Sequence, residues 1–88
     1  MYLAKVIGTV VSTKKEASLT GYKLLVVEKV AADLTGLEEE FVVADYVGAG
    51  NGDYVLVGTG SSIRVSEKQA RVCVDAAIIG IIDTVDTT

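Results

Sequence analysis

The chain has 88 residues and a formal net charge of −4, from 8 basic and 12 acidic residues, and it contains no histidine. This length predicts one small domain over residues 1–88, and the acidic balance argues against nucleic acid as a partner, because that binding depends on neutralising phosphates. The absence of histidine excludes Ser-His-Asp and Cys-His catalysis and removes the commonest transition-metal ligand.

β-Branched residues and glycine punctuation predict five strands, over residues 2–13, 22–32, 41–47, 54–57 and 76–85. The polar segments 14–21 and 33–40 are expected to connect the first three strands. Between 62 and 70 the pattern becomes that of a short helix, with Ser66 and Gln69 as a capping box. Gly8 and Gly80 are expected to mark a bend or bulge within strands. Five short strands without βαβ alternation indicate an all-β barrel of the OB-like type with one short helix.

The segment GAGNGD resembles a nucleotide-binding loop only superficially. A dinucleotide fingerprint opens a helix, whereas this segment leads into the strand-like YVLV. Its density of Gly and Asn indicates a tight structural turn between two strands, in a hairpin-like setting that requires positive φ. The residues of this candidate turn are Gly48, Gly50, Gly52 and Asp53.

A second glycine-rich segment, GTGSS, precedes the predicted short helix, and it lacks the GK[ST] of a phosphate-binding P-loop. A glycine bend with a serine cap is therefore favoured over an anion site. Arg64 follows it, and its planar fork of donors suits either a subunit contact or a solvated surface position. The candidate residues for a subunit interface or ring axis are Gly60, Ser61, Ser62, Ile63 and Arg64.

No other residues form a pattern that indicates catalysis. The aspartates fall near predicted strand ends and turns, where capping explains them, and Cys73 has neither a second thiol nor a base in its motif. We therefore expect no catalytic residues, no metal and no cofactor, which favours a structural or binding protein over an enzyme.

The composition also predicts self-association. Hydrophobic residues make up 50% of the chain, yet size scaling gives a folded chain that leaves roughly 4,900 Å² exposed of about 13,300 Å². A subunit interface is the simplest place for the surplus. The apolar N-terminal run contains Lys5 and lacks the order of a signal peptide or a membrane span, so we expect a cytoplasmic protein with no membrane association.

The whole chain resembles the EutN/CcmL family, the pentameric vertex proteins of bacterial microcompartment shells. The first strand reads AKVIGTVVSTKK and is similar to the family's A-x-V-x-G-x-V-V-x-T-x-K, and LTGYKLLVV follows it as L-x-G-x-K-L-L-x-V. The most distinctive stretch is DYVGAGNGDYVLV, similar to D-x-V-G-A-G-x-G-D/E-x-V-L-V. GSSIR then resembles a G-S-S-A-R-like element, and VDAAIIGIID resembles the closing V-D-x-x-I-V-G-I-V-D.

This resemblance implies a five-stranded OB-like barrel that forms a cyclic homopentamer. It further implies a structural shell protein that caps shell vertices in the cytoplasm, with hexameric shell proteins as partners and no enzymatic activity. The alternative function is an OB-type oligonucleotide- or ligand-binding module, which shares the barrel but needs a basic face and exposed aromatic side chains.

Overall fold

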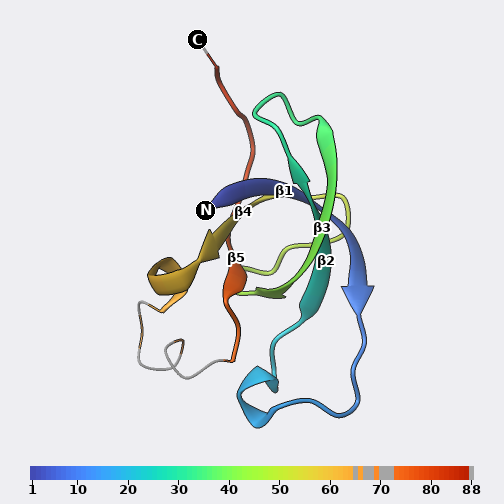
Figure 1. Cartoon of the computed structure of the whole chain (residues 1–88), viewed down its shortest axis with the longest axis vertical. Helices are drawn as coiled ribbons and strands as arrows, with labels where there is room; N and C mark the ends of the chain where they lie inside the picture. The colour runs from blue at the N-terminus through green and yellow to red at the C-terminus, as the bar shows by residue number, and fades with distance from the viewer. Residues whose placement is uncertain (65, 67–68, 70–72, 88) are drawn as a thin grey trace.

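Five strands close into a barrel in the order β1-β2-β3-β5-β4, with β4 pairing back onto β1 (Figure 1). The computed structural model describes residues 1–64, 66, 69 and 73–87. The strands are β1 Tyr2–Val10, β2 Leu24–Val30, β3 Gly36–Asp45, β4 Tyr54–Thr59 and β5 Ala76–Ile81, and two 3₁₀ turns are η1 Ala17–Leu19 and η2 Gly60–Ile63. The prediction of an all-β, five-stranded barrel is confirmed.

All strand pairs are antiparallel except β3 with β5. That parallel pair is short, because it joins only Ala44 and Asp45 to Ala77 and Ile78. Within the described residues, the remainder of β3 has a ladder partner on its β2 side alone. The barrel is therefore weakly closed between β3 and β5.

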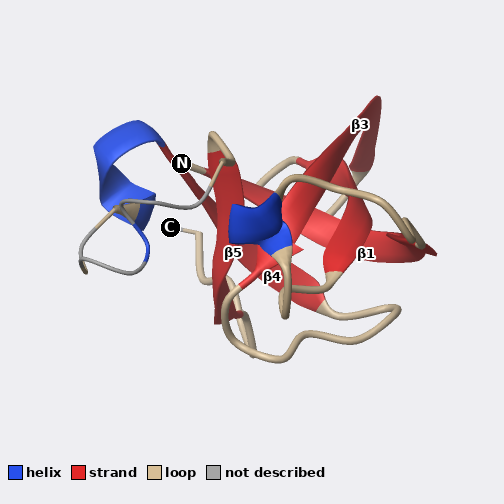
Figure 2. Cartoon of the chain, turned by 90° about the horizontal axis from the view of Figure 1, so that it is seen from below, coloured by secondary structure: helices blue, strands red, loops and turns tan. Residues whose placement is uncertain are grey.

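Small and β-branched side chains fill the barrel, because alternate residues of each short strand point inward. The core consists of Ala4, Val6, Leu25, Val27, Val43, Ala49, Val55, Val57 and Ile78. A second cluster of Ala44, Ile63 and Ala77 packs where η2 folds back on the barrel. Figure 2 shows η1 across the end of the barrel and η2 to one side of it.

Two register shifts lie where the sequence predicts irregularity. On β1 the pairing with β2 skips Ile7, next to Gly8. On β5 the pairing with β4 skips Ile79, next to Gly80. Such bulges increase local twist, which a small closed barrel requires.

The segment 33–40, expected to be a polar connection, is in part a strand. β3 begins at Gly36, and Glu28 and Glu40 are cross-strand partners. The turn between β2 and β3 is closed by two backbone hydrogen bonds between Ala31 and the 34–35 segment. Of the three successive glutamates, Glu40 is paired across the strands with Glu28, whereas the Glu38 amide donates to the Glu28 carboxylate at 3.1 Å. All three glutamate side chains are exposed to water.

The predicted strand ends also differ: β1 stops at Val10, β2 spans Leu24–Val30 and β5 stops at Ile81. Of the predicted 62–70 helix, residues 65, 67–68 and 70 lie outside the described residues. In the described part, the 3₁₀ turn η2 ends at Ile63, and the Gln69 amide donates to Ser66 Oγ at 3.1 Å.

Candidate functional site

The GAGNGD segment connects β3 to β4, but the two strands are not neighbours in the barrel. The expected hairpin is therefore wrong, because β3 pairs with β2 and β5, whereas β4 pairs with β1 and β5. The segment instead crosses the end of the barrel and inserts Ala49 into the core. Gly48 and Gly52 have φ of 85° and 88°, a conformation that favours glycine.

Two carboxylates hold this crossing segment in place. The nearly buried Asp45 accepts hydrogen bonds at Oδ1 from the amides of Val47, Gly48 and Ala49, at 3.0 to 3.2 Å. Asp53 Oδ2 accepts from the Gly50 amide at 2.8 Å. The segment thus carries its own acceptors for backbone groups that no strand partner satisfies.

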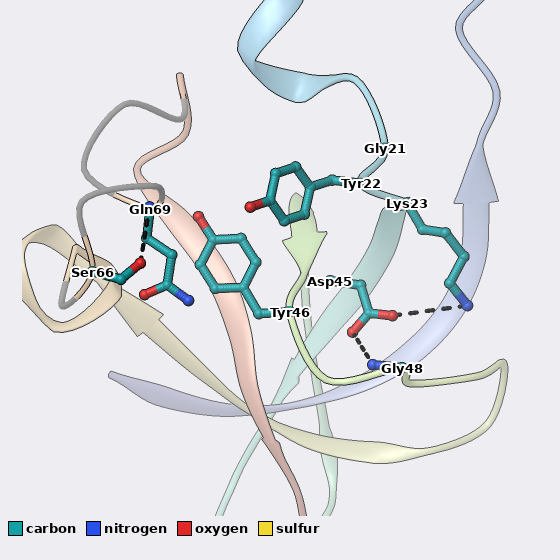
Figure 3. Close-up of a pocket in the computed structure, with 8 residues that line it drawn as sticks. All are labelled: Gly21, Tyr22, Lys23, Asp45, Tyr46, Gly48, Ser66 and Gln69. Atoms are coloured by element: carbon teal, nitrogen blue, oxygen red, sulfur yellow. Dashed lines mark hydrogen bonds and ion pairs between the residues drawn. The ribbon is translucent and has the colours of Figure 1, made fainter.

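Strand β1 and a lysine complete the attachment. The Gly52 amide donates to Val6 O and the Val6 amide to Asp53 O, both at 2.9 Å. Lys23 Nζ donates to Ala49 O at 3.0 Å and lies 3.8 Å from Asp45 Oδ2 (Figure 3). Asp53 and two of the three glycines, Gly50 and Gly52, thus make hydrogen bonds within the chain that attach the crossing segment to itself and to β1.

The η2 segment folds tightly onto the barrel. Ile63 is fully buried, and a Cβ on Gly58 would stand 2.9 Å from its Cγ2, so glycine is needed for this close approach. Ser62 Oγ accepts from the Thr59 amide at 3.0 Å and donates to Thr59 O at 2.6 Å. Gly60, at φ 57°, starts the turn, and Ser61 O accepts from the Arg64 amide.

The guanidinium group of Arg64 makes hydrogen bonds within its own chain. Nη1 donates to Gly60 O and Nη2 to Val74 O, each at 2.7 Å. The side chain is exposed, so it clamps the start of η2 to the segment that leads into β5 while remaining in contact with solvent.

A groove of about 430 Å³ opens beside this clamp, where β3 and β5 separate. Its apolar wall includes Phe41 and Val42, which are 41% and 57% exposed. The rings of Tyr2 and Phe41 are 5.5 Å apart, and Lys29 Nζ lies 5.5 Å from the Tyr2 centroid. The groove is lined by Tyr2, Phe41, Val42, Thr59, Gly60, Asp75 and Ala76.

Burial raises the pKa of the Tyr2 hydroxyl, and the nearby Asp75 carboxylate adds to the rise. The sequence singles out Gly60 as a candidate contact residue but does not single out Phe41 and Val42. A signal for these two exposed side chains was present in the sequence: β3 carries apolar residues on both faces, which a strand with a single buried face does not need.

Among the described residues, no group of three or more His, Cys, Asp or Glu could hold a metal ion, and Cys73 is exposed. None of the described helices is long and apolar enough to cross a membrane.

Comparison with known proteins places these features in a family. The defining pattern of the family described as "Ethanolamine utilisation protein EutN/carboxysome" matches residues 1–83, so the chain belongs to the EutN/CcmL family. The resemblance seen in the sequence is thereby confirmed.

Three relatives illustrate the match. The bacterial microcompartment shell vertex protein GrpN of Rhodospirillum rubrum (strain F11) is 54% identical over 87 residues, covering 99% of this chain and 98% of that protein. The carboxysome shell vertex protein CcmL of Synechococcus elongatus (strain ATCC 33912 / PCC 7942 / FACHB-805) is 53% identical, covering 98% and 87%. A solved structure described as the GrpN pentameric microcompartment shell protein from Rhodospirillum rubrum superposes with a TM-score of 0.90 at 53% identity, covering 100% of both chains.

Proposed function

We propose that this chain is a structural shell protein of a bacterial microcompartment, in which five copies form a ring that caps a vertex of the shell. The observation that carries this proposal is the near-complete match to proteins named as shell vertex proteins, together with a pentameric solved relative. The protein would then lie in the shell, within the bacterial cytoplasm, with residues 1–88 acting as one domain.

The mechanism is geometric. Hexagonal tiles alone make flat layers, so a closed polyhedron needs five-fold vertices, and we propose hexameric shell proteins as the neighbours of this ring. A ring of five closes when a head-to-tail contact carries the rotation of a fifth of a turn. The contact must also be specific, since a contact that fails to close produces filaments. The proposed role needs no catalytic residue and no cofactor.

We infer that the ring contact includes the groove between β3 and β5 and the Gly60–Arg64 segment at its rim. Phe41 and Val42 expose apolar side chains on the strand edge that lacks a ladder partner among the described residues. An exposed apolar edge of this kind is an association surface in a chain of this size. The Arg64 clamp would act as a positioning device that fixes the rim of the contact.

Native mass spectrometry of the purified full chain tests the proposal first. A particle of about 46 kDa, five times the 9.2 kDa chain, is expected. A hexamer mass would contradict the vertex role while keeping a shell assembly. A 9.2 kDa monomer at high concentration would overturn the ring and return the barrel to the binding-module alternative.

A pair of matched variants tests the contact surface. Val42→Glu places a charge in the inferred contact, where leaving it buried and unpaired is costly, and we expect monomers with an intact barrel. Val11→Glu is the control, because Val11 is 87% exposed and lies beyond the end of β1. Circular dichroism verifies folding of both. A Val42→Glu ring as stable as the wild type would exclude this face from the contact.

A further inference from the structure

The GAGNGD segment contains the pair Asn51–Gly52, whose covalent chemistry the shell function does not use. An asparagine that precedes glycine can lose its side-chain amide group, because glycine has no side chain to keep the backbone nitrogen away from the carboxamide. Asn51 and Gly52 are both exposed, and the Asn51 side chain makes no hydrogen bond to the other described residues. Asn51 is the single asparagine of the chain, so this chemistry is confined to one position.

The backbone around this pair forms a type II turn. The Asp53 amide donates to Gly50 O at 3.1 Å. Between them, Asn51 has a negative φ and Gly52 a φ of 88°, which is the pattern of this turn type. A type II turn gives Asn51 a ψ of about 120°. Attack on the carboxamide needs the Gly52 nitrogen to eclipse Asn51 Cβ, which requires a negative ψ, so the folded turn keeps the reacting atoms apart.

Strand β1 also holds the nitrogen that would attack. The Gly52 amide donates to Val6 O, and the Val6 amide donates to Asp53 O, both at 2.9 Å. The Asp53 carboxylate stabilises the same turn, because its Oδ2 accepts from the Gly50 amide at 2.8 Å. The Gly52 nitrogen can therefore rotate toward the carboxamide only after its bond to Val6 breaks. Local openings of this kind occur in folded proteins at a lower free energy than global unfolding.

We propose that Asn51 is a site of spontaneous deamidation, and that release of the turn from β1 controls its rate. In the open segment the Gly52 nitrogen loses its proton and attacks Cγ of Asn51. The new C–N bond closes a succinimide ring, the bond from Cγ to the side-chain nitrogen breaks, and that nitrogen takes up a proton and leaves as ammonia. Water then adds to either ring carbonyl and gives aspartate or isoaspartate. This inference goes beyond the shell function proposed above and does not depend on it.

Both products change the turn. Aspartate at position 51 brings another negative charge near the Asp53 carboxylate, which holds the Gly50 amide. Isoaspartate routes the backbone through the former side chain and adds a carbon atom between Gly50 and Gly52. The bond from the Asp53 amide to Gly50 O then no longer closes a four-residue turn. An isoaspartyl segment cannot regain its register on β1, so each such product is a permanent record of an opening.

The test is mass spectrometry of the full-length protein during incubation in buffer and in urea, with a methyltransferase specific for isoaspartate as the label. Exchange of the side-chain NH₂ for OH raises the mass, and the chain contains no Asp-Gly pair that would form isoaspartate by the same route. We expect deamidation to be at least about tenfold slower in buffer than in urea, because unfolding removes both restraints on the Gly52 nitrogen. Asn51→Ala should give no isoaspartate in either condition.

Asp53→Ala loosens the turn and leaves both reacting residues in place. It frees the Gly50 amide, and we expect it to speed deamidation in buffer about fivefold, each variant being compared with its own rate in urea. Asp33→Ala is the matched control, because Asp33 Oδ1 accepts one amide, that of Thr35, in the turn between β2 and β3. Its rate in buffer should equal that of the wild type.

Three results would overturn the proposal. They are the absence of isoaspartate in urea, a wild-type rate in buffer equal to that in urea, and equal rates in buffer for Asp53→Ala and Asp33→Ala. Circular dichroism verifies that both variants are folded, and the comparison of buffer with urea decides the matter for the wild type alone. A monomeric chain that deamidates as expected would refute the ring and support this inference.

Discussion

Removal of the Asp45 carboxylate tests whether the crossing segment holds the barrel end closed. Asp45→Ala leaves the amides of Val47, Gly48 and Ala49 without their acceptor. Asp45→Asn keeps an oxygen in the same place but loses the charge. The two variants therefore separate the geometry of the acceptor from its charge.

The expected loss can be worked from the contacts. Hydrogen bonds to a charged acceptor are worth about 1.5 to 3 kcal/mol each. The amides of Val47 and Gly48 are only part-buried and can bond water in the variant, whereas that of Ala49 is buried and cannot. We therefore expect Asp45→Ala to lower the free energy of unfolding by about 3 to 5 kcal/mol. The Lys23 pair contributes at most about 1 kcal/mol of this, because the Lys23 side chain is 58% exposed.

The assay is urea unfolding at one fixed protein concentration, since a ring makes the apparent stability depend on concentration. Tyrosine fluorescence reports it, because the chain has 4 tyrosines and no tryptophan. We expect Asp45→Asn to cost about 1 to 2 kcal/mol, and Asp53→Ala, which frees one amide, about 1 kcal/mol. If Asp45→Ala costs no more than Asp53→Ala, the three-amide reasoning is refuted.

Three further predictions concern the groove and its rim. Gly58→Ala should lower the free energy of unfolding by about 1 to 3 kcal/mol, measured by urea, because its Cβ would stand 2.9 Å from the Ile63 side chain. The raised pKa of Tyr2, from burial and then from Asp75, means that the contribution of Tyr2 to stability is constant below about pH 10 and falls above it. Tyr2→Phe should lessen that alkaline loss in urea titrations. Arg64→Ala should make the ring dissociate at about tenfold higher protein concentration in native mass spectrometry, and an unchanged dissociation would give Arg64 no role in assembly.

Local sequence signals located most of the barrel but not its connectivity. Val and Ile content marks every strand, and the glycines at 8 and 80 mark two of the three register shifts between the described strands, because these are properties of a few adjacent residues. The GAGNGD segment carries the composition of a hairpin turn, yet it spans two strands that never pair. Which strand lies beside which depends on contacts between residues far apart in the chain, and turn composition holds no information about them.

The candidate site shows the same division. The sequence singles out a glycine bend next to serines, which comprises Gly60, Ser62 and Ile63, and it singles out Arg64 by its side chain. The two backbone carbonyls that Arg64 binds could not be predicted, because tertiary packing brings them to it. The exposed pair Phe41 and Val42 was missed, because apolar residues on both faces of a strand ordinarily indicate burial on both. Here only the last two residues of β3 pair with β5, and the open edge before them leaves the Phe41 and Val42 side chains in solvent.

The accessible area of the chain bears on the role of the open edge of β3. The accessible area is 5417 Å², about 500 Å² more than the roughly 4,900 Å² expected for a compact chain of this mass. In the proposed ring of five, the groove and the edge of β3 would meet a different surface of the neighbouring copy, because a contact repeated around a ring joins two unlike surfaces. A contact between two unlike surfaces is heterologous, and a heterologous contact builds a ring or a filament rather than a two-fold dimer. Ile63, Gly58 and the Arg64 clamp attach η2 tightly beside the groove. If the groove is the proposed ring contact, this fixed rim would let one rotation angle, and hence one ring size, repeat at every contact.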